Sequence, residues 1–269
     1  MNSWNQQFRN TRVVILTGLL VLFCAGLACA DGLEDARRRG NFRIGVKTDF
    51  PPFGYLDSSG AIQGFDADLA RYLGKTLFNE PSGAELVPVT SGGRIPFLYS
   101  GWIDIIIASL SATEDRQRVL EFSTPYFISG SLLLVLKDSP IQGLQGLAGK
   151  TVAVLAGSVQ EKDLEQIAPN ARRLTFEKLP EAVAALKQKK ADALAQDDLI
   201  VLAAAKKNPD LRVSGHSFLP RPYVIAVRKG EVKFISWVNA QLERMKADGT
   251  FQLLWQKHFG EFEASLVKP

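Results

Sequence analysis

The order of predicted strands and helices constrains the fold most, because a β-α-β-α-β pattern occurs twice along the chain. Period-two apolar runs alternate with amphipathic runs in both units, and Asp66 is expected to cap the first helix. This order predicts an α/β fold with mainly parallel sheets flanked by helices. The predicted strands lie at 42–47, 85–89, 103–107, 151–155, 171–176 and 192–196, and the predicted helices lie from 66, at 95–99, at 159–167, from 180 and at 198–206.

Two further apolar strands, 131–136 and 223–227, stand before and after the second unit. They predict that the chain crosses twice between two lobes, which makes a hinge with a cleft beside it. We therefore expect lobe 1 at 31–129 plus 224–269 and lobe 2 at 130–223. Small-molecule sites favour such clefts, at the carboxyl ends of the strands.

The first 30 residues have the pattern of a secretory signal peptide. Arg9 and Arg12 form a basic start, residues 13–27 are apolar, and Ala28-Cys29-Ala30 offers small residues for cleavage. We therefore expect residues 1–30 to be removed on export and the mature protein to be periplasmic. Both cysteines of the chain lie in this segment, so we expect no disulfide, no metal site and no cofactor.

The charge of the chain argues against a nucleic-acid partner. The chain has 32 basic and 28 acidic residues, and the basic ones form no stripe interleaved with aromatic residues. Arg37-Arg38-Arg39 is predicted to be a solvated helix end. We expect the protein to be a monomer.

Two hydroxyls and one arginine follow the apolar run 103–107 directly. Ser109, Ser111 and Arg116 would deliver hydrogen-bond donors at the mouth of a sheet. The planar fork of arginine can bind both oxygens of a small carboxylate. The alternative for this segment is a strand, a Ser/Thr helix cap and a surface arginine.

Seven segments, in register across both units, are similar to those of polar amino-acid-binding proteins of bacterial ABC importers. The resemblance covers roughly residues 40 to 260 and implies a two-lobed periplasmic-binding-protein fold of type II. It also implies closure around a free amino acid and delivery to an inner-membrane ABC permease. The segments lie at 45–54, 64–70, 94–98, 109–116 with 122–126, 152–158, 192–197 and 246–251.

The resemblance implies roles for residues of both lobes. Arg116 would bind the α-carboxylate of the ligand, and Ser109, Leu110 and Ser111 would help to hold the carboxylate and the ammonium. From lobe 2, the backbone N–H groups of Ser158 and Val159 would face the carboxylate, and Asp197 would pair with the ammonium. The residues agree with this, because Ser158 and Val159 open a predicted helix, whose N-terminus favours an anion. The alternative for Asp197 is a helix N-cap.

The side-chain pocket would be set by cations and an aromatic wall. Lys47 and Arg94 suit a second carboxylate, and Phe50 would contact the methylenes of the ligand. An acidic amino acid is therefore the first expectation, and glutamine or another polar amino acid is the second. If Asp49 faces the same side as Lys47, it neutralises that lysine, and the acidic expectation rests on Arg94 alone.

Relatives often have an aromatic lid where Ser91 stands, so one wall of the pocket is expected to be open. Phe53 could line the pocket or belong to the core.

Two other functions are compatible with the same fold. One is an enzyme like cyclohexadienyl or arogenate dehydratase, but the acid that such enzymes place in the cleft would fall near Ile200, which cannot transfer a proton. No nucleophile stands beside either histidine, so we do not expect an enzyme. The other is a ligand-sensing receptor module, which is normally joined to a membrane span or a signalling domain.

Overall fold

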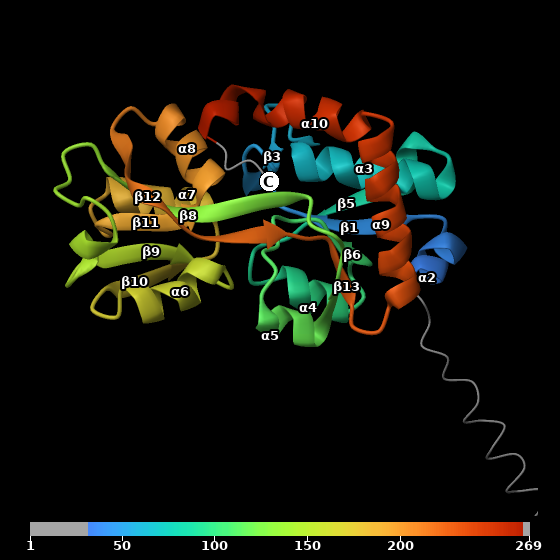
Figure 1. Cartoon of the computed structure of the whole chain (residues 1–269), viewed down its shortest axis with the longest axis horizontal. Helices are drawn as coiled ribbons and strands as arrows, with labels where there is room; N and C mark the ends of the chain where they lie inside the picture. The colour runs from blue at the N-terminus through green and yellow to red at the C-terminus, as the bar shows by residue number, and fades with distance from the viewer. Residues whose placement is uncertain (1–31, 266–269) are drawn as a thin grey trace, which may run out of the picture.

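A computed structural model describes residues 32–265. The predicted signal peptide lies outside the described residues. Two five-stranded sheets stand side by side, each with helices on both faces, and two long strands lie together at the junction between them (Figure 1). We call the part built on the first sheet lobe 1 and the part built on the second sheet lobe 2.

The sheet of lobe 1 has the order β5-β1-β6-β13-β7. Strand β1 pairs in parallel with β5 and β6, whereas β13 runs antiparallel to β6 and β7. A small antiparallel sheet, β2-β3-β4, adjoins it. The strands are β1 (Phe42–Val46), β2 (Asp49–Phe50), β3 (Gly54–Leu56), β4 (Ile62–Gln63), β5 (Ala84–Pro88), β6 (Ile105–Ile106), β7 (Leu120–Phe122) and β13 (Ala226–Arg228). The helices are α2 (Gly32–Arg39), α3 (Phe65–Phe78), α4 (Arg94–Tyr99), α5 (Glu114–Val119), α9 (Val232–Ala247) and α10 (Thr250–Phe259).

The sheet of lobe 2 has the order β10-β9-β11-β8-β12. Strand β9 pairs in parallel with β10 and β11, whereas β8 runs antiparallel to β11 and β12. The strands are β8 (Phe127–Leu136), β9 (Thr151–Leu155), β10 (Arg172–Phe176), β11 (Ala193–Asp197) and β12 (Leu211–Tyr223). The helices are α6 (Val159–Ile167), α7 (Leu179–Lys187) and α8 (Asp198–Lys207), and short 3-10 turns lie at Pro81–Gly83, Leu144–Leu147 and Gly260–Ser265.

Most predicted elements are confirmed, and helix α6 has the predicted bounds. The strand at 223–227 is wrong in detail, because β12 ends at Tyr223 and β13 begins only at Ala226. Strand β12 itself was missed. It contains Pro220 and Pro222 and two register shifts, which an edge strand tolerates and an apolar-pattern search overlooks. The sheets are mixed rather than wholly parallel.

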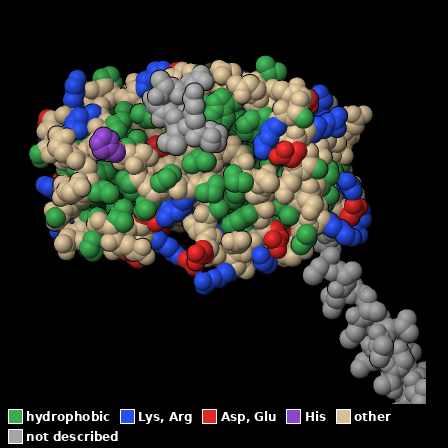
Figure 2. All heavy atoms as spheres, viewed as in Figure 1, with side chains coloured by type: hydrophobic (Ala, Val, Ile, Leu, Met, Phe, Trp, Pro, Cys, Tyr) green, Lys and Arg blue, Asp and Glu red, His purple; other side chains and the backbone are tan. Residues whose placement is uncertain are grey.

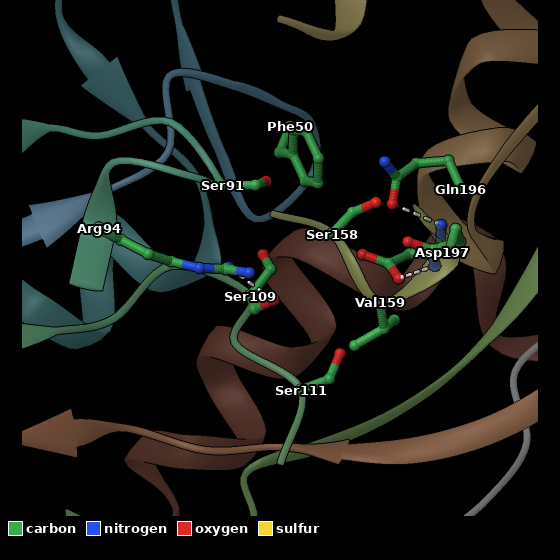
Figure 3. A pocket seen from close by; sticks show the side chains of 10 residues that line it. Phe50, Ser91, Arg94, Ser109, Ser111, Ser158, Val159, Gln196 and Asp197 are labelled. Atoms are coloured by element: carbon green, nitrogen blue, oxygen red, sulfur yellow. Dashed lines mark hydrogen bonds between the residues drawn. The ribbon is translucent and has the colours of Figure 1, made fainter. Parts of the chain in front are cut away.

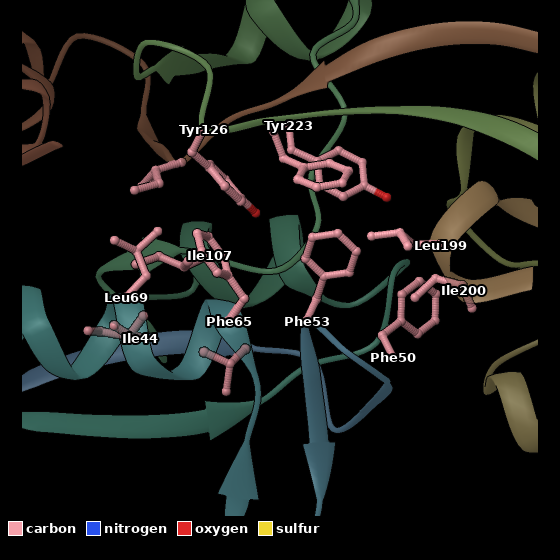
Figure 4. Close-up of a cluster of buried hydrophobic side chains, with 14 of the residues drawn as sticks. Ile44, Phe50, Phe53, Phe65, Leu69, Ile107, Tyr126, Leu199, Ile200 and Tyr223 are labelled. Atoms are coloured by element: carbon pink, nitrogen blue, oxygen red, sulfur yellow. The ribbon is translucent and has the colours of Figure 1, made fainter. Parts of the chain in front are cut away.

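The main hydrophobic core runs from lobe 1 into lobe 2 without a break. An aromatic cluster fills the junction, where the rings of Phe53 and Tyr223 lie 5.3 Å apart (Figure 4). The ring of Phe53 also lies 5.0 Å from that of Phe127 and 5.2 Å from that of Phe259. Phe53 is fully buried there, so it is a core residue rather than a pocket wall. The crossover strands are therefore packed on both lobes.

Charged side chains of both signs are scattered over the surface. On the face drawn in Figure 2, Lys and Arg lie among acidic and apolar side chains and form no continuous basic strip. The run Arg37-Arg38-Arg39 ends α2, as predicted. Arg38 pairs with Asp35, and Arg39 pairs with the buried Asp104.

Candidate functional site

A pocket lies between the lobes and is lined by both of them (Figure 3). It brings together most of the residues predicted from the sequence. Lys47, Leu110 and Arg116 are the predicted residues that do not line it. The lining residues are Phe50, Ser91, Arg94, Ser109 and Ser111 from lobe 1, and Ser158, Val159, Gln160, Gln196 and Asp197 from lobe 2.

The turn that carries Ser109 has an unusual backbone. Ser109 has a φ of 47°, in the left-handed region that side chains rarely adopt. Its N–H and hydroxyl both donate to Oδ2 of Asp66, at 2.8 and 3.2 Å. The prediction that Asp66 caps its helix is therefore wrong, because Gly64 holds the cap position and the carboxylate of Asp66 binds this turn instead. Leu110, the next residue of the turn, is buried in the core of lobe 1.

Arg94 is a buried cation at the pocket wall. Its Nη1 donates to the carbonyls of Ala108 and Ser109, at 2.6 and 3.2 Å, whereas its Nε is buried without a hydrogen-bond partner. Burial lowers the pKa of the guanidinium, and the charge of Asp197 across the pocket opposes that shift. The site therefore holds a positive charge that an anionic group of a ligand would stabilise.

Arg116 lies beside the pocket and bridges the two lobes. Its Nη1 donates to the carbonyl of Ser111 in lobe 1, at 2.8 Å, and its Nη2 donates to the carbonyl of Gly157 in lobe 2, at 2.9 Å. Burial, together with repulsion from Arg94, lowers the pKa of Arg116 to about 9. The two arginines thus form a region of positive charge along the lobe 1 side of the pocket.

Lys47 is fully buried and is paired by Asp49, although no single strand joins them, because β1 ends at Val46 and β2 begins at Asp49. Its Nζ lies 3.3 Å from Oδ1 of Asp49, 3.3 Å from Oγ of Ser91 and 4.0 Å from the ring centroid of Phe50. Burial lowers the pKa of Lys47 to about 8, while Asp49 acts in the opposite direction. Lys47 therefore holds Ser91 in the pocket wall through this hydrogen bond, and Asp49 balances the charge of Lys47 within the protein.

Helix α6 begins at the pocket, as predicted. Ser158 stands at its N-cap position, but its hydroxyl makes no capping bond and is buried without a partner. The N–H of Ser158 donates to the carbonyl of Leu155, at 3.0 Å, so that predicted ligand donor is already used. Val159 is the first helical residue, and N–H groups there have no acceptor within the helix.

Asp197 ends β11 inside the pocket, and its side chain makes no capping bond to α8. Asp197 thus holds the N-cap position of α8, as the alternative had it, but its carboxylate is not used for capping. Burial raises the pKa of its carboxyl, while the bond from Gln160 and the nearby hydroxyl of Tyr223 oppose the rise. The charge of Arg94, across the pocket, also opposes the rise.

Gln160 and Gln196 are site residues that the sequence analysis missed. Gln160 Nε2 donates to Oδ1 of Asp197 and to the hydroxyl of Ser131, both at 2.8 Å, and leaves its Oε1 buried without a partner. Gln196 Oε1 accepts from the N–H of Asp197, at 2.8 Å, and leaves its Nε2 buried without a partner. The one sequence signal for these two glutamines is that each is next to a predicted site residue, Gln160 to Val159 and Gln196 to Asp197.

The lobes touch around the pocket, so this is a closed form. Asp49 Oδ2 accepts from the N–H of Leu179, the first residue of α7, at 2.9 Å. Lys162 of α6 pairs with Asp115 of α5 at 2.9 Å. A Cβ on Gly157 would lie 2.7 Å from the Cα of Gly92, so the expected open wall beside Ser91 is closed by lobe 2.

Within residues 32–265 there is no candidate metal site and no candidate membrane-spanning helix. No three His, Cys, Asp or Glu side chains gather there as metal ligands would. None of the helices described combines the length and apolar content needed to cross a bilayer.

Comparison with known proteins places this architecture in a family. An ABC transporter glutamine-binding protein of Bacillus subtilis is 39% identical over 233 residues, which cover 86% of this chain and 85% of that protein. A solute receptor for L-cysteine of Neisseria gonorrhoeae has a TM-score of 0.84 and 31% identity, and covers 88% of this chain and 97% of its own. An ancestral amino acid-binding protein, a precursor of cyclohexadienyl dehydratase, has a TM-score of 0.77 and 35% identity, and covers 84% of this chain and 99% of its own.

The fold is therefore that of type II periplasmic binding proteins, as the resemblance implied. The family model that matches describes bacterial extracellular solute-binding proteins, family 3, and it spans residues 42–261. It thus covers both lobes and every residue of the pocket. This chain belongs to family 3 of the bacterial extracellular solute-binding proteins.

Proposed function

We propose that this protein captures a free α-amino acid between its lobes and delivers it to an ABC permease of the inner membrane. The observation that carries the proposal is the distribution of charge across the pocket. The buried cation Arg94 and the partly buried cation Arg116 stand on lobe 1, and the buried anion Asp197 stands on lobe 2. A zwitterion would match both charges only when the lobes are closed, so binding would drive closure. The glutamine-binding relative supports this class of ligand.

The two charged ends of the ligand take different partners in this proposal. Arg116, with the hydroxyls of Ser109 and Ser111, binds the α-carboxylate, because the guanidinium keeps N–H groups beyond the two that bind backbone. The N-terminus of α6 at Val159 faces the same carboxylate. Asp197 accepts from the α-ammonium.

The ligand's side chain is a polar one, and glutamine fits the pocket better than glutamate or aspartate. Asp49 matches the charge of Lys47, which removes half of the case for an acidic side chain. Gln196 Nε2 and Gln160 Oε1 offer one donor and one acceptor, as the carboxamide of glutamine requires. Arg94 disfavours cationic side chains such as those of lysine and arginine. Glutamate and aspartate remain the second ligand class.

The hinge and the cellular location are parts of the same proposal. We place the lobe boundaries at 130 and 223–224, where β8 and the end of β12 lead from one sheet to the other (Figure 1). Residues 1–30 direct export, so the protein works in the periplasm. We expect it to act as a monomer.

Isothermal titration calorimetry with the 20 amino acids tests this proposal. The mature protein, freed of bound ligand by unfolding and refolding, should bind glutamine one to one, with a Kd of about 1 µM or lower, and should bind glutamate more weakly. Arg116→Ala should abolish the binding. Arg118→Ala is the matched control, because Arg118 stands on the same helix with an exposed side chain, and its Kd should be that of the wild type.

Two outcomes would contradict the proposal. Absence of binding to every amino acid would remove the function, and tightest binding of lysine or arginine would remove the side-chain argument. Turnover of prephenate or arogenate by the pure protein would favour the dehydratase alternative. Ile200, the residue near which that acid would fall, is buried in the core.

A further inference from the structure

Asp66 is a buried carboxylate that the binding scheme above does not use. It stands in the first turn of α3, with none of its surface exposed, yet it makes no bond to the end of its helix. Its Oδ2 accepts from the N–H and hydroxyl of Ser109, and its Oδ1 accepts from the hydroxyl of Tyr126, at 3.0 Å. One carboxylate thus joins two segments that are distant from it in sequence.

The first of these segments is the ligand turn, residues 108–112. The left-handed backbone of Ser109 is strained and persists only when its surroundings hold it. Asp66 holds the N–H side of Ser109, and Arg94 holds the carbonyls of Ala108 and Ser109 on the other side. The shape of the turn therefore depends on this buried acid and base.

The second segment is the hinge. Tyr126 immediately precedes β8, and its N–H donates to the carbonyl of Tyr223, the last residue of β12, at 3.0 Å. The side chains of Tyr126 and Tyr223 lie next to each other above Phe65 and Phe53 (Figure 4). Asp66 therefore binds Tyr126 at the point where the first crossover strand leaves lobe 1.

The ligand turn is also bonded to the second crossover. The N–H of Val224 donates to the carbonyl of Leu110, at 2.9 Å, and the N–H of Ala112 donates to the carbonyl of Pro222, at 2.8 Å. Ser111 forms an isolated bridge with Tyr223. The turn is thus connected to both crossovers, to β12 by its backbone and to β8 through Asp66.

We infer that Asp66 is a positioning residue that sets the ligand turn and couples it to the opening and closing of the hinge. The inference rests on the proposed function in so far as the turn binds a ligand. Asp66 touches no ligand itself and acts through Ser109 and Tyr126. A substitution there should change ligand affinity and the mobility of the turn, and not only stability.

Asp198 provides a matched control, because it is a buried carboxylate of lobe 2 that also holds the hinge. It accepts from the hydroxyl of Ser129 at 2.7 Å and from the N–H of Gly130 at 2.9 Å, and it does not line the pocket. Asp198→Asn should therefore destabilise the fold without disturbing the ligand turn.

The first measurement is a double-mutant cycle on the Kd of the amino acid that the wild type binds. Asp66→Asn should raise the Kd by about tenfold or more, and Tyr126→Phe by about threefold or more. The two effects should not add in the double variant, because both remove the same connection. Asp198→Asn should leave the Kd within about threefold of the wild type.

Hydrogen exchange of the ligand-free protein tests the inference independently of any ligand. Asp66→Asn should speed exchange in 108–112 and in 126–130, whereas Asp198→Asn should speed it only in the second segment. Unchanged exchange in 108–112, or an unchanged Kd with a loss of stability like that of Asp198→Asn, would overturn the inference. If the wild type binds no amino acid, the proposed function fails, and the exchange result alone decides the role of Asp66.

Discussion

Asp49→Asn tests how the buried cation Lys47 is held in the pocket wall. The substitution removes the negative charge 3.3 Å from Nζ but keeps an oxygen that can accept from the N–H of Leu179. Lys47 cannot reach solvent, so it responds by losing its proton. The charge-dependent cost of the variant is therefore limited by the free energy of deprotonating Lys47.

The magnitude follows from the pKa of Lys47, which is about 8 in the folded protein. Deprotonating such a group at pH 7 costs about 1.4 kcal/mol, because one pKa unit corresponds to about 1.36 kcal/mol. Asp49→Asn should thus lower the free energy of unfolding by at most about 1.4 kcal/mol through this charge at pH 7. If the buried lysine had to stay charged, the variant would instead lose about 3–5 kcal/mol of the free energy of unfolding.

The pKa of Lys47 also determines whether the free energy of unfolding rises or falls with pH. The pKa of Lys47 falls from 10.5 to about 8 on folding, so the folded state binds fewer protons between these values. The free energy of unfolding therefore rises with pH across this window. In the variant, the pKa of Lys47 falls further, so the free energy of unfolding begins to rise at a lower pH. The difference between wild type and variant should shrink as the pH rises through 8 and vanish near pH 9.5.

Urea unfolding of the ligand-free protein at pH 7, 8 and 9.5 measures this difference. In a Lys47→Met background, Asp49→Asn should show no pH-dependent cost. Asp115→Asn is the control, because it removes the carboxylate of an exposed pair between the lobes and should change the free energy of unfolding little. A cost that exceeds about 3 kcal/mol at pH 7, or that grows toward pH 9.5, would refute the reasoning.

Three further predictions follow from the same contacts. Arg116→Lys should bind the amino acid at least about tenfold more weakly than the wild type in calorimetry, because lysine cannot form the arginine fork; equal affinity would remove Arg116 from carboxylate binding. Burial raises the pKa of Asp66 from 3.8 to about 7, so its contribution to the free energy of unfolding should fall by about 4 kcal/mol between pH 4 and pH 7, and urea titrations should show this slope in the wild type but not in Asp66→Asn. Gly157→Ala should weaken ligand binding by about tenfold or more, because its Cβ would strike the Cα of Gly92 only when the lobes are closed; an unchanged Kd would show that closure leaves more room there.

Much of the fold follows from local pattern. Helix α6 could be placed to the residue, because its amphipathic run follows a clear strand and turn. Strand β12 could not, because its prolines and register shifts break the period of two. Its pairing with β8 depends on residues far away in the sequence.

The site was partly predictable for a similar reason. Charges at strand ends, such as Asp197, indicate a site, and the two-residue spacing of Lys47 and Asp49 allowed for their pairing although no continuous strand joins them. The role of Asp66 could not be inferred, because an aspartate at the start of a helix is interpreted as a cap residue, whether its carboxylate bonds to the helix or to other segments. The contacts of Arg116 with Ser111 and Gly157 likewise depend on how the lobes meet.

The aromatic cluster at the junction makes separate melting of the two halves unfavourable. Phe53 from one half packs on Phe127 at the start of a crossover, and the apolar core continues from there into the other half. Parting the halves during unfolding would expose these rings to water, at a cost of about 1.5–3 kcal/mol for each large side chain. Calorimetric scans should therefore show a single cooperative transition, and residues 130–223 expressed alone should precipitate rather than fold.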